Sequence, residues 1–249
     1  MPKKKQLSFT DQFLKKFEKL AYTRRNQTVW VDFVTVTACS ISNATDSENY
    51  DVREKLYVDT IKNYTHDEII IFAKLLAITV MALEDDPEQD FLGTIFEQRL
   101  NLGNARNGQY FTPYYIGKFM AKLQGTDERP VVYRDGYVSV HDCYCGSGTL
   151  LIAYANKLKE QGISCSDEAL FIAQDIDYVM AMMCYIQLSL LGCSGFVAVG
   201  DALVNPNPTK ENRWHMPMSF RLALKQMKQE HTCAPWIVNG EFCADFNRT

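Results

Sequence analysis

The most constraining feature of this sequence is an alternation of short apolar segments with helical segments between residues 138 and 199. The apolar segments are residues 138–141, 169–173 and 195–199, and the helical segments between them are residues 149–160 and 178–191. Apolar runs of this length are typical of buried strands, whereas the longer segments have the apolar spacing of helices. A strand-helix-strand-helix-strand order predicts an α/β fold with a partial, doubly wound, Rossmann-like parallel sheet.

The residues before this alternation are predicted to be mainly helical. Apolar side chains recur at helical spacing in residues 8–21, 29–38 and 57–83. Ser8 or Thr10 is a suitable N-cap for the first segment, and Thr65 with Glu68 forms a capping signal in the last. Turn-forming residues gather between Asn101 and Gly108, so we predict a helical domain over residues 1–105 and a second domain over residues 106–249. A helix over residues 114–123 is expected to follow, with Thr112 as its cap.

The charge of the chain is unevenly distributed. The formal net charge is -4, which argues against a protein that grips nucleic acid with its whole surface. Residues 1–25 hold eight Lys and Arg side chains against Asp11 and Glu18, which gives +6 there and leaves -10 for the remaining chain. Two interpretations remain open: a solvated helix face with a lysine-rich tail, or an arm that contacts phosphates.

The apolar runs and the cysteines indicate a cytoplasmic protein without a membrane span. The longest apolar run, residues 69–83, is interrupted by Lys74 and is shorter than the roughly 20 residues that cross a bilayer. The basic N-terminus is followed by an amphipathic segment, unlike a secretory signal. The eight cysteines lack the C-x2-C spacing of a zinc site, so we expect reduced, buried thiols and no metal site.

Polar or glycine-rich residues follow each of the three predicted strands. Asp142 and a loop with Gly146 and Gly148 follow the first strand, Asp175 and Asp177 follow the second, and Asp201 follows the third. Ligands of such sheets bind outside the carboxyl ends of the strands, where an acidic side chain can accept both ribose hydroxyls of an adenosine. A single acid at a strand end is more often a helix cap. Three in succession favour an adenosine-containing ligand. The GxGxxG fingerprint is absent, so a nicotinamide cofactor is disfavoured.

At these positions the sequence resembles the adenine-specific N-6 DNA methylases, of the kind that forms the modification subunit of type I restriction systems. The matching motifs are Phe91-Leu92-Gly93, Gly108-Gln109-Tyr110-Phe111-Thr112-Pro113, Asp142-x-x-Cys145-Gly146-Ser147-Gly148-x-Leu150, Asp175-Ile176-Asp177 and Gly200-Asp201-Ala202-Leu203. Their order is that of the group in which the aromatic Thr-Pro motif comes first. The resemblance covers roughly residues 90–243 and departs from the family at Cys143, where proline is usual.

The resemblance implies that S-adenosylmethionine is the cofactor and DNA a partner. It places Tyr110, Phe111, Thr112 and Pro113 along the methionine end of the cofactor, and it places Asp142, Gly146, Ser147 and Gly148 around the amino acid and sulfonium. Asp175 would hold the ribose, Ile176 would pack on the adenine, and Asp201 beside Ala202 would accept from the adenine amine. No metal is implied.

The catalytic motif of the family, Asn/Asp-Pro-Pro-Tyr/Phe, has an imperfect counterpart here. The segment Asn205-Pro206-Asn207-Pro208 lacks an aromatic residue and an intervening strand, so we interpret it as a loop. In the better match, residues 236–242, Asn239 and Phe242 would accept from the target amine and stack on a flipped adenine. Gly240 and Glu241 replace the two prolines, which reduces stiffness and adds a negative charge.

Two functions from different classes therefore remain open. The chain is either a DNA adenine-N6 methyltransferase or a non-catalytic module that uses the same fold to bind cofactor or a partner protein. Since seven residues follow Phe242, we expect the remaining strands of the catalytic sheet to be missing and the exposed sheet edge to be covered by another segment or a second chain. Trp214 and residues 216–218 are a candidate exposed interaction surface.

Overall fold

The computed structural model describes residues 7–103, 111–124, 126–219 and 221, and also the backbone of residues 237–238 and 241–242. Its helices are α1 (Phe9–Ala21), α2 (Asn26–Asn43), α3 (Tyr50–Ile61), α4 (His66–Asp85), α5 (Phe91–Thr94), α6 (Tyr114–Leu123), α7 (Arg129–Asp135), α8 (Thr149–Glu160) and α9 (Tyr178–Leu190). A π-helical turn, η1 (Ile95–Arg99), follows α5, and a 3-10 turn, η3 (Lys210–Asn212), precedes β4. The strands are β1 (Val138–Asp142), β2 (Ala169–Asp175), β3 (Gly195–Val199), β4 (Arg213–His215), β5 (Ile237–Val238) and β6 (Glu241–Phe242).

The N-terminal helices form where the local signals predict them. The Ser8 side chain caps α1 by accepting from the Asp11 amide, and Thr65 and Glu68 form a complete capping box at the start of α4. The stretch over residues 57–83 is divided, because α3 ends before this capping box and α4 begins at it. Inside, Phe13 packs edge-on against Phe33 and Phe91, so α1 and α2 share one aromatic core with α5.

The sheet confirms the predicted α/β fold with a partial Rossmann-like arrangement. Its order is β1-β2-β3-β4, and the first three strands are parallel with a helix between each successive pair. β4 pairs antiparallel with β3 at the edge of this sheet, and the sequence did not predict it. Because β1, β2 and β3 run in the same direction, their carboxyl ends meet at one edge of the sheet.

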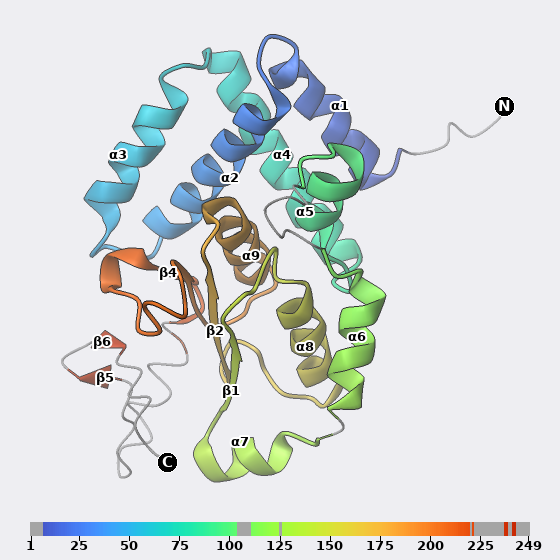
Figure 1. The fold of residues 1–249 in the computed structure, drawn as a ribbon, viewed down its shortest axis with the longest axis vertical. Helices are drawn as coiled ribbons and strands as arrows, with labels where there is room; N and C mark the ends of the chain where they lie inside the picture. The colour runs from blue at the N-terminus through green and yellow to red at the C-terminus, as the bar shows by residue number, and fades with distance from the viewer. Residues whose placement is uncertain are drawn as a thin grey trace, which may run out of the picture.

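Helix α9 lies in the middle of the molecule. It contacts β2 and β3 on one side and α2 on the other, as the stacking of these elements in Figure 1 shows. Nearly every side chain of α9 is therefore buried, and its sequence is apolar all round rather than amphipathic. Buried residues from α1 through β4 form one continuous cluster, so the N-terminal helices and the sheet share a core.

Several side chains lie differently from their predicted positions. Trp214 and Met216 are 6% and 1% exposed, so the predicted exposed interaction surface is wrong at these two residues. Trp214 is buried because the guanidinium group of Arg53 lies over its ring at 4.3 Å and Tyr185 packs beside it. Helix α6 has its predicted bounds, but Pro113 occupies its N-cap with no side-chain bond, so Thr112 is not the cap. Cys143 is exposed, unlike the buried thiols that were expected.

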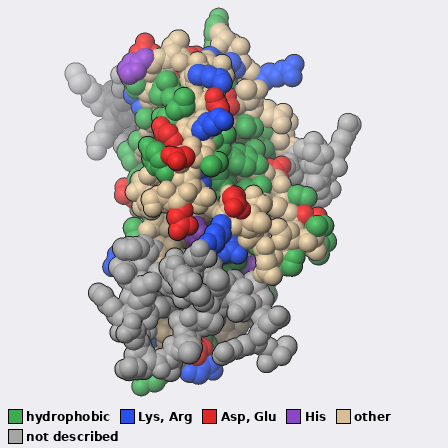
Figure 2. All heavy atoms as spheres, turned by 90° about the vertical axis from the view of Figure 1, so that its left-hand side faces the viewer, with side chains coloured by type: hydrophobic (Ala, Val, Ile, Leu, Met, Phe, Trp, Pro, Cys, Tyr) green, Lys and Arg blue, Asp and Glu red, His purple; other side chains and the backbone are tan. Residues whose placement is uncertain are grey.

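The described helices and the face shown in Figure 2 bear on whether the chain has a membrane span or a wholly basic surface. Within the described residues, no helix is both long and apolar enough to cross a bilayer. Figure 2 shows the face that carries α3, where acidic and basic side chains are interspersed around a central group of hydrophobic ones. Residues 205–208 belong to neither helix nor strand, which confirms their interpretation as a loop.

Candidate functional site

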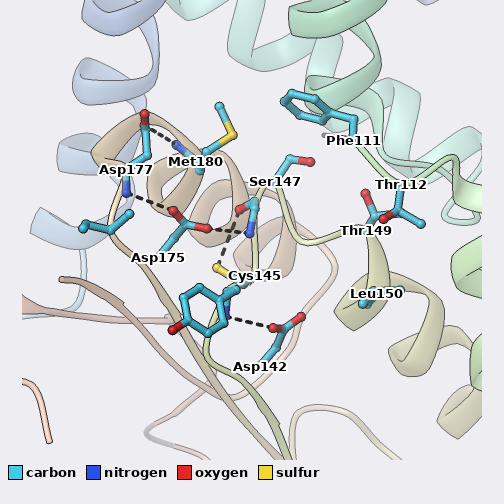
Figure 3. Close-up of a pocket in the computed structure, with 13 residues that line it drawn as sticks. Phe111, Thr112, Asp142, Cys145, Ser147, Thr149, Leu150, Asp175, Asp177 and Met180 are labelled. Atoms are coloured by element: carbon cyan, nitrogen blue, oxygen red, sulfur yellow. Dashed lines mark hydrogen bonds between the residues drawn. The ribbon is translucent and has the colours of Figure 1, made fainter. Parts of the chain in front are cut away.

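A pocket of about 540 Å³ opens at the carboxyl ends of β1 and β2 (Figure 3). The predicted cofactor residues that line it are Phe111, Thr112, Asp142, Gly146, Ser147, Asp175 and Ile176. They come from the segment before α6, the loop between β1 and α8, and the turn between β2 and α9. The pocket therefore lies where a doubly wound sheet binds its ligand.

The loop between β1 and α8 depends on two glycines with positive φ. Gly146 has φ 54° and Gly148 has φ 98°, a region that side chains with a Cβ rarely adopt. A Cβ on Gly148 would also lie 3.0 Å from the Cys184 sulfur of α9. Glycine at position 148 therefore allows the loop to pack closely on α9. The loop ends at the N-terminus of α8, which carries partial positive charge.

Asp175 joins the two loops that border the pocket. Its Oδ2 accepts from the Gly146 amide at 2.8 Å, and its Oδ1 accepts from the Asp177 amide at 2.9 Å. Burial raises the pKa of Asp175, and the charges of Asp177 and Asp142 add to this effect although the two amide bonds oppose it. Each carboxylate oxygen has a second lone pair, so Asp175 can still accept from ligand hydroxyls.

The charge of the pocket is negative. Asp142, Asp175 and Asp177 line it, and the described lining residues include no lysine, arginine or histidine. Asp142 Oδ1 accepts from the Tyr144 amide at 3.1 Å. Asp177 caps α9 by accepting from the amides of Val179 and Met180. Such a pocket suits a ligand with positive charge and hydroxyl donors, and it is unfavourable for phosphate groups.

Apolar surfaces complete the pocket. Ile176 is 65% exposed and Tyr144 is 56% exposed, although both belong to residue types that are usually buried more deeply. Phe111 enters from the segment before α6 and packs on Phe96 at a centroid distance of 5.8 Å. Exposed apolar side chains beside carboxylates provide contact for a flat heterocycle and acceptors for its polar atoms.

The sequence did not reveal the role of Asp90 behind this pocket. The hydroxyl groups of Ser147 and Thr149, both lining residues, donate to its Oδ2. The side chain of Asp90 is buried and precedes α5, whose Gly93 amide donates to Oδ1 at 2.8 Å. Ser147 therefore contributes its backbone to the pocket while its side chain is engaged behind it. The local signal for Asp90 was only that of a helix cap.

The comparison with protein families identifies the chain. The family model described as N-6 DNA Methylase matches residues 87–221, which is more than half of the sequence and includes the whole described pocket. The chain belongs to the N-6 DNA methylase family. Searches of the curated proteins and of the solved structures found no match. N-6 DNA methylases are S-adenosylmethionine-dependent methyltransferases that act on DNA.

The remaining residues expected from the N-6 DNA methylase motifs lie outside the described pocket lining. Pro113 begins α6, and Gly148 packs on Cys184. Asp201 is partly buried beyond β3 and accepts from the Leu203 amide at 2.9 Å, and Ala202 lies in the same turn.

Three further predicted residues are the cofactor residue Tyr110 and the catalytic residues Asn239 and Phe242. Tyr110 and Asn239 lie outside the described residues, and Phe242 is described only through its backbone in β6. Among the residues that the structure does describe, no group of three or more His, Cys, Asp or Glu side chains could hold a metal ion.

Proposed function

We propose that the pocket at the ends of β1 and β2 binds S-adenosylmethionine. The observation that carries this proposal is its negative lining, in which Asp142, Asp175 and Asp177 lie among apolar and hydroxyl side chains. S-adenosylmethionine has a sulfonium, an ammonium group and two ribose hydroxyls, all of which suit carboxylate partners. A nucleoside triphosphate would bring three phosphates to the same carboxylates and is disfavoured by charge.

Each described residue has a role in this proposal. Asp175 accepts from the ribose hydroxyls with the lone pairs that its two backbone bonds leave free. Ile176 packs on the adenine with its exposed side chain, and Asp142 lies near the positively charged methionine end. Phe111 and Thr112 close the pocket from the segment before α6. Asp201 and Ala202 complete the adenine end from the turn after β3.

The proposed reaction is methylation of adenine N6 in DNA. When bound, S-adenosylmethionine would supply the methyl group for transfer to adenine N6, and the displaced N6 proton would go to solvent. Asn239 and the Gly240 carbonyl would accept from the amine and orient its lone pair, and Phe242 would stack on the flipped base. These residues position the reacting atom and need not act as strong bases.

Calorimetric titration with S-adenosylmethionine tests the cofactor proposal. Wild-type protein is expected to bind with micromolar affinity, and Asp175→Ala is expected to lower the affinity about 10- to 100-fold because acceptors for the ribose are lost. Asp127→Ala is the matched control, since this exposed carboxylate pairs with Arg129 away from the pocket. Titration with ATP should show no comparable binding. Equal affinity for ATP, or an unchanged affinity in Asp175→Ala, would contradict the proposal.

The catalytic part is tested separately, by transfer of a labelled methyl group to unmethylated DNA. Asn239→Ala should abolish transfer while leaving cofactor affinity unchanged, since Asn239 is assigned to the target base and not to the cofactor. Transfer that survives this substitution would remove Asn239 from the mechanism.

The alternative function is that of a non-catalytic binding module. It is favoured by one specific observation: Gly240 and Glu241 stand where the family has two prolines. Under this alternative the protein binds cofactor but does not methylate DNA. The variant Gly240→Pro/Glu241→Pro distinguishes the two, because a gain of methyl transfer only in the variant would show that the natural motif is degenerate.

We also propose a cytoplasmic protein of two domains, residues 1–105 and 106–249, whose sheet is completed by another segment or chain. Within the described residues, β1 pairs only with β2 and its other edge has no strand partner. An open edge of a parallel sheet is usually covered. Size-exclusion chromatography with light scattering would detect a second copy. A monomer over the whole concentration range would indicate that another segment of the same chain covers the β1 edge.

A further inference from the structure

A buried carboxyl group connects the N-terminal helices to the pocket loop. Asp90 is 5% exposed and lies just before α5, whereas its partners Ser147 and Thr149 lie 57 and 59 residues later in the chain. Its two oxygens have distinct partners. Oδ2 accepts from the hydroxyls of Ser147 and Thr149, the latter at 2.6 Å, and Oδ1 accepts from the Gly93 amide and from Gln187 Nε2, both at 2.8 Å.

Gln187 of α9 extends this network to the loop backbone. Its Nε2 also donates to the Ser147 carbonyl at 2.9 Å, and its Oε1 accepts from the Leu92 amide at 3.0 Å. Gln187 is fully buried, so each of these bonds is shielded from water. Asp90 and Gln187 together therefore hold the side chain and the carbonyl of Ser147 from behind the pocket.

Gly93 permits this close approach. A Cβ built on Gly93 would lie well inside van der Waals contact with both the Asp90 carboxyl group and the Ser147 hydroxyl. The backbone of Gly93 is helical, so an alanine would be acceptable to the helix itself and would be excluded only by these neighbours. The first turn of α5 is thus packed directly against the pocket loop.

We infer that Asp90, with Gly93, is a positioning residue that fixes the glycine-rich loop in its cofactor-binding form. This inference rests on the proposed function, because it assigns the loop to the S-adenosylmethionine pocket. Gly146, Ser147 and Thr149 line the pocket, while the hydroxyls of Ser147 and Thr149 donate to Asp90. Without Asp90 those hydroxyls are free to turn, and the loop loses the contact that selects one backbone form.

The chemistry of the network provides a conservative variant. In Asp90→Asn, the amide oxygen can accept from Gly93 and Gln187, and the amide NH₂ can donate to the two hydroxyl oxygens of Ser147 and Thr149, which accept as well as donate. In Asp90→Ala, all four partners lose their bond. A positioning role therefore predicts that Asn retains most of the function that Ala removes.

The experiment compares calorimetric affinity for S-adenosylmethionine with hydrogen exchange of the full-length protein. Asp90→Ala and Gly93→Ala are expected to weaken binding about tenfold or more and to accelerate amide exchange in residues 146–149, because hydrogen bonds to the loop are lost. Asp90→Asn is expected to stay near wild type in both measurements. Thr94→Ala is the control for Gly93→Ala, since Thr94 is the exposed neighbour on the same turn.

The outcomes separate the positioning role from general stability and from the proposed function. Wild-type affinity and loop exchange in folded Asp90→Ala would overturn the inference, as would an Asn variant as impaired as Ala. If Asp90→Ala fails to fold, Thr149→Val, which removes one hydroxyl of the network, should show a smaller change of the same kind. If the wild type does not bind S-adenosylmethionine, the proposed function fails, while loop exchange in Asp90→Ala and Asp90→Asn still tests the positioning role.

Discussion

Two buried polar networks join the N-terminal helices to the sheet, and they end at different places. Arg53 of α3 is 3% exposed; its Nη1 pairs with Asp46 at 2.5 Å, and its Nη2 donates to the Arg213 carbonyl of β4 at 2.5 Å. Asp90 instead reaches the loop between β1 and α8, through Ser147 and Thr149. The first network holds an edge strand, whereas the second holds the lining of a pocket.

The difference shows that one helical layer can serve both stability and binding. Arg53 covers the Trp214 ring, and its hydrogen bonds to Ser42, Asp46 and Arg213 lie away from the residues that line the pocket. A change there should be measured as a lower free energy of unfolding with little effect on ligand affinity. A change at Asp90 should affect affinity as well. The comparison holds only if the two effects can be separated.

The largest effect is expected for Arg53→Met. This substitution leaves the Asp46 carboxylate buried without its cation and removes the bond to the Arg213 carbonyl. Removing one partner of a buried ion pair typically costs about 3–5 kcal/mol of stability. Urea unfolding should show this loss, while calorimetry below the melting temperature should show an unchanged affinity for S-adenosylmethionine.

A double variant provides the control for this prediction. Although burial raises it, the hydrogen bonds from Asn49 and the charge of Arg53 together hold the pKa of Asp46 below its ordinary value. Arg53→Met/Asp46→Asn removes both charges and should regain part of the lost stability, because no unpaired charge stays buried. A Met variant that loses affinity in proportion to its stability would break the comparison between the two networks.

The next effect concerns pH and the same edge of the sheet. Burial lowers the pKa of His215 in β4 to about 4, with Arg213 and Arg53 adding to the effect and Asp46 opposing it. In the unfolded chain the pKa is near 6.5, so between these values the unfolded state binds more protons than the folded state. Stability should therefore fall by about 3 kcal/mol as the pH is lowered from 6.5 to 4.

His215→Gln measures this contribution directly, because glutamine does not titrate in this range. The unfolding free energy of the wild type should therefore decrease relative to that of the variant as the pH falls below 6.5. Asp175 has the opposite tendency: burial raises its pKa, so its contribution disfavours the folded state at higher pH. A constant difference across the range would show that His215 does not titrate as its burial implies.

Local periodicity predicted most of the elements that carry the pocket. The bounds of α6, α8 and β3 match the sequence prediction, since each element has a strong apolar pattern and a clear start or stop signal. The strand β4 was missed because three residues show no periodicity, and only pairing with β3 makes them a strand. Local patterns therefore predict elements, and long-range pairing determines short edge strands.

The candidate site divides along the same line. Residues in sequence motifs, such as Gly146 and Asp175, were found because glycine turns and acids at strand ends have a local signature. Asp90 was missed because the side chains that donate to it lie 57 to 97 residues away, and its own surroundings resemble an exposed acidic cap. Trp214 was wrongly expected at the surface because its cover, Arg53, comes from α3, far earlier in the chain.

Gln187→Leu should have an intermediate effect and sharpens the comparison on the pocket side. Leucine is apolar and one bond shorter, and it leaves the Leu92 amide and the Ser147 carbonyl without their partner, which costs about 1–3 kcal/mol per buried group. Both stability and affinity for S-adenosylmethionine should fall, unlike in Arg53→Met. Urea unfolding and calorimetry on the same sample check this, and a loss of stability without a loss of affinity would remove Gln187 from the loop support.

The smallest effect is expected for Thr65→Ala, which tests whether affinity depends on stability in general. Thr65 caps α4 by accepting from the Glu68 amide at 3.4 Å, and the Glu68 carboxylate accepts from the Thr65 amide at 2.8 Å. Loss of such a cap typically costs about 1 kcal/mol. This site touches neither network, so the melting temperature should fall while affinity stays the same. A weaker affinity in Thr65→Ala would mean that the pocket responds to any loosening of the helical layer, and Asp90 would then lose its special position.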